Sequence, residues 1–135
     1  MRRLSLAGLG VSMLLMAVPV LAHHAFAAEF DASQPVALKG TLTKMEWTNP
    51  HGWIFVDVKG ADGKVVNWAC ETGGANALYR RGWRKEDLVP GIVIVVDGFQ
   101  ARNNSPTMNA TAITFKDGRK LFAGSSSQNN ATSGK

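Results

Sequence analysis

The sequence predicts an all-β domain with one short helix. Short segments alternate between apolar and polar residues with a period of two, which is typical of half-buried strands. Fourteen glycines among 135 residues suit a small, tightly coiled barrel. A helical stretch separates the third strand from the fourth, which is the element order of a small five-stranded OB-like β-barrel. An open β-sandwich fragment is the alternative architecture.

Three strands precede the predicted helix. Residues 36–43 alternate, with Val36, Leu38 and Leu42 on one face. Residues 53–59 form the second strand, and residues 65–71 return as the third after the turn at residues 60–64, whose Gly-Ala-Asp-Gly sequence suits a hairpin connection.

The helix and two further strands follow. Residues 75–81 form the predicted helix, which ends at Gly82. Residues 92–96 are nearly all apolar, a pattern that indicates a strand buried on both faces, closed by Gly98. Residues 111–115 form the fifth strand, and the chain then turns back.

The sequence divides into four parts. Residues 1–22 combine a basic start, an apolar run and a small-residue ending, which predicts a signal peptide cleaved after Ala22. Residues 23–35 form an N-terminal arm, residues 36–124 the OB-like barrel domain, and residues 125–135 a polar, disordered tail. We therefore expect a periplasmic protein with no stable membrane span after cleavage.

The charge and the cysteine count limit the partners. The chain carries a net charge of +5, and loss of Arg2 and Arg3 with the leader leaves 13 basic against 10 acidic residues, or +3. Such a mild charge does not indicate a nucleic-acid partner. Cys70 is the single cysteine, so it is either a buried small hydrophobe or a free thiol. Four basic residues cluster near the predicted helix: Arg80, Arg81, Arg84 and Lys85. This cluster is either a solvated face or a site that binds an anionic ligand or the membrane surface.

Aromatic and polar residues gather around the second and third strands. OB barrels bind ligands on this face and on the neighbouring loops. The sequence therefore predicts a non-enzymatic binding module for a small ligand or a periplasmic partner protein, using Trp47, Asn49, His51, Trp53, Trp68 and Glu71. In the alternative interpretation the tryptophans are core residues and Glu71 pairs with a nearby arginine.

A second hypothesis is copper binding. Cleavage after Ala22 makes His23 the N-terminal residue, whose α-amine and imidazole can chelate a metal together with His24 or His51. Nitrogen-rich ligand sets of this kind suit Cu(II) and, less selectively, Zn or Ni. Cleavage after Ala27 instead removes both N-terminal histidines, and the arm is then without a metal role.

Catalysis ranks third among the functional hypotheses. Glu71 lies at a strand end, so we expect it near the Asn49–His51 turn, where it can form an acid–base pair with His51. The sequence contains no Ser-His-Asp order, phosphate loop or zinc-protease motif. We therefore predict no catalytic residues.

Several motifs carry a family resemblance. They lie in segments 23–26 (His-His-Ala-Phe), 47–53 (Trp-Thr-Asn-Pro-His-Gly-Trp), 62–71, 78–83 (Leu-Tyr-Arg-Arg-Gly-Trp), 88–91 and 117–121. Together they resemble a family of small exported bacterial proteins catalogued as a domain of unknown function. The resemblance implies an exported address and an OB-like fold, and no reaction. Ile92 stands where the family usually has an acidic residue, and Cys70 stands where an aromatic or aliphatic residue is common.

Overall fold

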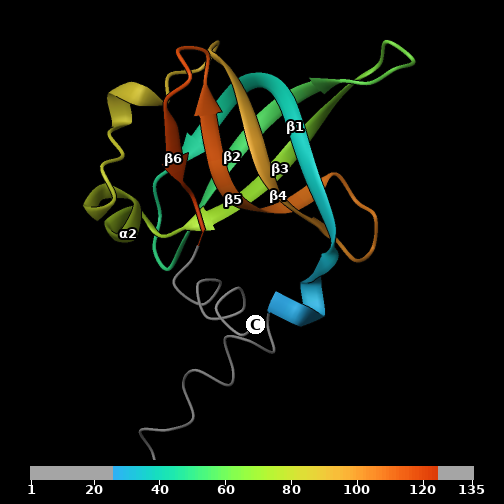
Figure 1. Cartoon of the computed structure of the whole chain (residues 1–135), viewed down its shortest axis with the longest axis horizontal. Helices are drawn as coiled ribbons and strands as arrows, with labels where there is room; N and C mark the ends of the chain where they lie inside the picture. Colours follow the sequence, from blue (N-terminus) through green and yellow to red (C-terminus); the bar gives the residue numbers. More distant parts are fainter. Residues whose placement is uncertain (1–25, 125–135) are drawn as a thin grey trace, which may run out of the picture.

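The computed structural model describes residues 26–124. Figure 1 shows strands wrapped around a common interior, with short helices at the margin. The elements, in order, are β1 (Phe30–Glu46), β2 (His51–Lys59), β3 (Val65–Gly73), α2 (Ala75–Arg80), a 3-10 turn η1 (Lys85–Asp87), β4 (Val93–Ala101), β5 (Thr107–Phe115) and β6 (Lys120–Phe122). The predicted signal peptide, both N-terminal histidines and the predicted tail lie outside the described residues.

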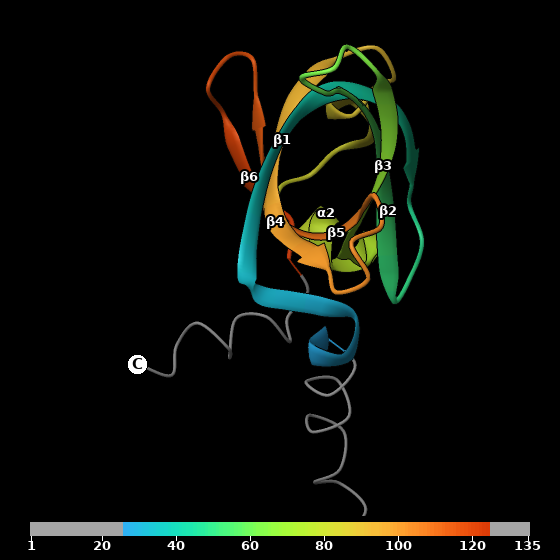
Figure 2. The ribbon, with the colours of Figure 1, turned by 90° about the vertical axis from the view of Figure 1, so that its right-hand side faces the viewer.

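Five of the strands are joined in a closed ring of hydrogen-bonded pairs. β1 pairs with β2 and β4, β2 with β3, and β4 with β5, all antiparallel. A parallel pairing between β3 and β5 closes the ring. Figure 2 looks into this ring, and α2 is seen through its opening. The closed order favours the predicted OB-like barrel over an open sandwich fragment.

The strands are longer than the sequence predicted. β1 begins at Phe30 rather than at Val36, and a sixth strand, β6, extends the sheet beyond β5. β4 continues through Gly98 to Ala101 and does not end at the glycine; its pairing with β5 shifts register at residues 97–98, where Thr111 on β5 is the extra residue of a bulge.

The prediction that residues 92–96 are buried on both faces is wrong. Ile94 and Val96 point into the core, whereas Val93 is 42% exposed and Val95 is only half-buried. The apolar run therefore reflects a strand with one covered face and one uncovered face, and not a central strand enclosed by two layers.

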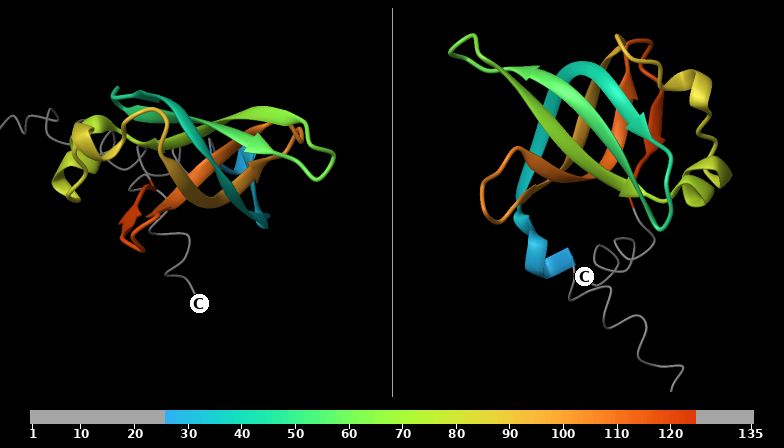
Figure 3. Two further views of the ribbon diagram at one scale, coloured as in Figure 1. Left: turned by 90° about the horizontal axis from the view of Figure 1, so that it is seen from above. Right: turned by 180° about the vertical axis from the view of Figure 1, so that it is seen from behind.

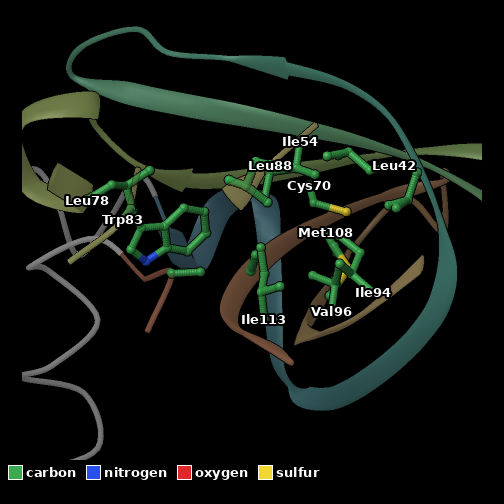
Figure 4. Close-up of a cluster of buried hydrophobic side chains, with 13 residues drawn as sticks. Leu42, Ile54, Cys70, Leu78, Trp83, Leu88, Ile94, Val96, Met108 and Ile113 are labelled. Atoms are coloured by element: carbon green, nitrogen blue, oxygen red, sulfur yellow. The ribbon is translucent and has the colours of Figure 1, made fainter. Parts of the chain in front are cut away.

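The core fills the inside of the ring. Its side chains alternate inward from the strands; Ile54 and Val56 on β2 are both fully buried. Figure 4 shows Cys70 lying above Met108 among these apolar side chains. Cys70 is 0% exposed, and burial raises the pKa of its thiol to about 12. The prediction of a buried small hydrophobe is confirmed.

The segment between β3 and β4 closes one end of the ring. Leu78 of α2 and Trp83 after it are fully buried in the core cluster, and Trp47 packs edge-on against Trp83 with ring centroids 6.4 Å apart. Trp83 Nε1 donates to the carbonyl of Phe122 on β6 at 3.0 Å. The right view of Figure 3 places α2 at one side of the ring and the helical turn of residues 26–29 at another. Among the described residues, the helices are too short and too polar to cross a bilayer.

The basic cluster contributes to this closure. The Arg81 guanidinium stacks over Phe122 at 4.9 Å, and one of its nitrogens donates to the carbonyl of Gly124. Arg84 stacks over Tyr79 at 4.1 Å and donates to the carbonyls of Tyr79 and Trp83. Both arginines therefore hold backbone in place.

The close approach of β4 to β5 beside this bulge requires glycine at residue 98. A Cβ placed there lies 2.1 Å from the carbonyl oxygen of Asn109 on β5, closer than any real contact. We expect Gly98→Ala to lower the free energy of unfolding by about 1–3 kcal/mol, measured by urea denaturation, because the paired strands must move apart. Gly60→Ala is the matched control, since its Cβ meets only the flexible end of Asp62. Equal effects of the two substitutions contradict this interpretation.

Candidate functional site

The turn between β1 and β2 is joined to the start of α2. The Thr48 hydroxyl donates to the carbonyl of His51 at 2.6 Å, and the Thr48 carbonyl accepts the Ala75 amide at 2.9 Å. The Asn49 side-chain oxygen accepts the amide of Asn76 at 3.2 Å. The amides at the start of α2 thus find acceptors in this turn, and the same contacts place His51 at the start of β2.

Gly74 allows this close approach. A Cβ at residue 74 lies 2.5 Å from the carbonyl oxygen of Pro50 and 2.6 Å from the side-chain oxygen of Asn49. Any other residue forces the turn away from the helix, so the glycine permits the contact that fixes the entry of β2.

His51 and Glu71 form the central pair of the site. His51 Nδ1 lies 2.9 Å from Glu71 Oε1; the His51 side chain is 45% exposed and the Glu71 side chain 11% exposed. The two residues are neighbours because His51 pairs with Gly73 and Trp53 pairs with Glu71, so both side chains leave the same face of the β2–β3 hairpin. A buried carboxylate thus directs one nitrogen of a half-exposed imidazole and leaves Nε2 unused by this contact.

Glu71 belongs to a row of side chains on the outer face of the ring. In register, Trp53 on β2 lies beside Glu71, Glu71 beside Asn109 on β5, and Asn109 beside Phe99 on β4. Asn109 is 4% exposed, and its buried side-chain oxygen has no hydrogen-bond partner among the described residues. A buried acceptor without a partner costs free energy, so Asn109 adds to the energetic cost of this part of the outer face.

The charge of Glu71 is disfavoured by its surroundings. Burial raises the pKa of the Glu71 carboxyl above its ordinary value, and the negative charge of Glu29 raises it further. The positive form of His51 acts in the opposite direction. Burial is the largest of these effects, so the carboxyl binds its proton more tightly in the folded protein than in the unfolded chain.

A pocket of about 400 Å³ opens beside Trp53. Its volume lies within the range of small-molecule sites. Aromatic, charged and hydroxyl side chains from three separate segments line it, among them Glu29, Phe30, Trp53, Arg102, Ser105 and Thr107.

The segment before β1 forms one wall of this pocket. The ring of Phe26 packs on Phe30 at 5.7 Å and edge-on to Phe99 at 6.1 Å. The Arg102 amide donates to the carbonyl of Glu29 at 2.9 Å, and Arg102 Nε donates to the carbonyl of Ala27 at 2.6 Å. These contacts hold Glu29 over the outer face that carries Glu71.

Residues 11–110 match a family described as a family of unknown function, DUF6152. This chain belongs to that family. The match covers β1 to β4 and the start of β5, and it ends before segment 117–121, so the DUF6152 match does not include that part of the resemblance noted in the sequence. No curated protein matches the chain.

The structure brings together three of the six residues predicted as a ligand site in this DUF6152 protein. His51, Trp53 and Glu71 share the outer face, and the expected approach of Glu71 to His51 is found. Trp47 and Trp68 pack against the core instead. Asn49 supports the start of α2. Glu71 pairs with His51 rather than with an arginine.

Residues that were not among the six predicted ligand-site residues complete this surface. Glu29, Arg102 and Thr107 line the pocket, and Asn109 lies beside Glu71. The only signal in the sequence was the polar loop at residues 103–106, because the parallel pairing that brings β5 beside β3 leaves no local pattern.

The described part of the chain does not supply a complete metal site by itself. Within residues 26–124, no three His, Cys, Asp or Glu side chains are grouped so that they could hold a metal ion. The predicted set of His23, His24 and His51 includes two residues outside this range.

The raised pKa of Glu71 makes stability depend on pH. Between the ordinary glutamate value and the raised value, the folded protein binds more protons at this residue than the unfolded chain does. The contribution of Glu71 to the free energy of unfolding is therefore fully present at low pH and falls as pH rises through this interval. We expect urea denaturation between pH 4 and pH 8 to show wild type losing stability relative to Glu71→Gln.

The exposed Glu86 provides the control for this measurement. The difference between wild type and Glu86→Gln should stay nearly constant over the same pH range. A difference for Glu71→Gln that grows in favour of wild type with rising pH contradicts the assigned direction.

Proposed function

We propose that this protein is a non-enzymatic binding module that takes a small ligand on the outer face formed by His51, Trp53 and Glu71. The observation that carries the proposal is the buried Glu71 carboxylate, which joins a half-exposed histidine beside a pocket of about 400 Å³. The alternative partner on this surface is a periplasmic protein.

Energetic cost supports a binding role for this pair. Burial of a carboxylate is unfavourable, and an ion pair rarely repays the whole penalty. Glu71 also faces the charge of Glu29 and lies beside the unpartnered oxygen of Asn109. A ligand that donates a hydrogen bond to Glu71 relieves part of the cost at that carboxylate, while the indole of Trp53 provides an apolar wall for a ring or a sugar.

We also propose that the protein acts in the periplasm after cleavage of residues 1–22. The basic start, the apolar run and the small residues at its end support this address. In that compartment the pocket is exposed to small solutes and peptides, which are therefore the proposed class of ligand.

Ligand binding is tested by screening sugars, dipeptides and small ring compounds against ¹⁵N-labelled protein. We expect compounds that bind to shift the amide signals of Trp53, Glu71 and Thr107, and Trp53→Ala to weaken their binding at least fivefold, since it removes a wall of the pocket. Phe55→Ala is the matched control, because Phe55 is half-buried on the same strand and does not line the pocket. Shifts confined to other surfaces, or equal losses in both variants, overturn the proposal.

The orientation of His51 favours a second candidate function, copper binding. Metal-binding histidines commonly donate one ring nitrogen to a carboxylate and bind the metal through the other. Glu71 contacts Nδ1 in this way. His23 and His24 stand three and two residues before Phe26 in the sequence. The Phe26 ring packs edge-on against Phe99, which belongs to the same row of side chains as Glu71.

Copper binding is tested by native mass spectrometry of the protein as cells process it, with one equivalent of Cu(II). We expect a chain that begins at His23 and retains one copper, and a loss of affinity of tenfold or more in His24→Ala. Glu71→Gln should weaken copper binding about 10–100-fold, as carboxylate partners of metal-bound histidines do. A chain that begins at Ala28, or one that begins at His23 and retains no copper, excludes this function and leaves ligand binding unaffected.

A further inference from the structure

The uncovered face of β4 carries a second group of apolar side chains. Val93 and Val95 point away from the core at the start of the strand, and Val93 is 42% exposed. In register, Val95 lies between Lys39 on β1 and Thr114 on β5. This end of β4 is opposite to Ala101, which borders the pocket beside Trp53.

These side chains line a separate hollow of about 430 Å³. Val93 and Val95 supply its apolar surface, and its rim carries two lysines; the lining residues are Lys39, Val93, Ile94, Val95, Thr114, Phe115 and Lys116. The Phe115 side chain lies on the other face of the sheet, because Phe115 is paired with the inward-facing Ile94 and packs against the core under the Arg119 guanidinium. No carboxylate belongs to this lining among the described residues. An uncovered apolar surface with cationic ends is suited to a ligand that is apolar along its length and anionic at its end.

The two lysines differ from the other cations nearby. Lys120 pairs with Asp97 at 3.4 Å, and Arg119 pairs with Asp87 at 2.9 Å and with Asp117 at 3.8 Å. Neither Lys39 nor Lys116 forms an ion pair with a described residue. The neighbouring carboxylates are thus already paired, and the rim of the hollow keeps positive charge available.

We infer that this hollow binds the free carboxylate form of an aliphatic acid, such as a medium-chain fatty acid. The chain lies on Val93 and Val95, where its apolar surface leaves water. The carboxylate lies between Lys39 and Lys116. The inference is independent of the ligand proposed at Trp53, because the two sites share no residue.

Decanoate is the probe for this site, added to ¹⁵N-labelled protein below its micelle concentration. We expect it to shift the amide signals of Val93, Val95, Thr114 and Lys116. Decyltrimethylammonium carries the same chain with a positive end, and acetate carries the carboxylate without the chain, so both should bind at least fivefold more weakly. Shifts confined to the pocket beside Trp53 overturn the inference and support the other site.

Lysine substitutions test the charge contribution. Lys39→Gln and Lys116→Gln should each weaken decanoate binding about twofold to fivefold, the range expected for exposed charge pairs. Lys59→Gln, at the exposed end of β2, is the matched control and should leave binding unchanged. Val95→Ser should also weaken binding, because it removes apolar contact area. Unchanged affinity in both rim variants, or equal binding of decyltrimethylammonium, overturns the inference.

Discussion

The parallel pairing of β3 with β5 is the contact on which the rest of the structure depends. Residues 69–71 are paired on both sides, with β2 along one edge and with residues 107–109 of β5 along the other. This short contact converts a row of antiparallel strands into a closed ring. It encloses Cys70 within the core, and it places Glu71 between two neighbouring strands instead of at a sheet edge.

Local patterns in the sequence predicted those features of the fold that depend on residues close together in the chain. Alternation and the turn at residues 60–64 identified the β2–β3 hairpin, and the position of Glu71 at a strand end predicted its approach to His51. The pairing of β3 with β5 joins residues almost 40 positions apart and depends on closure of the whole ring, so no local pattern indicates it. For the same reason Asn109 and Thr107 were not predicted beside the site.

Residues of one chemical type have different roles here, and composition alone could not separate them. Trp53 lies on the outer face, whereas Trp47 and Trp68 pack against the core, because the direction of a side chain depends on its register in the strand. Arg81 and Arg84 hold backbone carbonyls, while Arg80, directly before Arg81, is exposed. The apolar run of β4 likewise looked uniform, although only alternate residues enter the core.

The contact of Gly74 with Pro50 has a mechanical consequence. The first turn of α2 and the loop that carries His51 touch through backbone and cannot move independently without loss of the hydrogen bonds between them. α2 is itself anchored in the core through Leu78 and to β6 through Arg81 and Trp83. The position of the His51 loop is therefore fixed by backbone contact relative to the end of the ring that the helix closes.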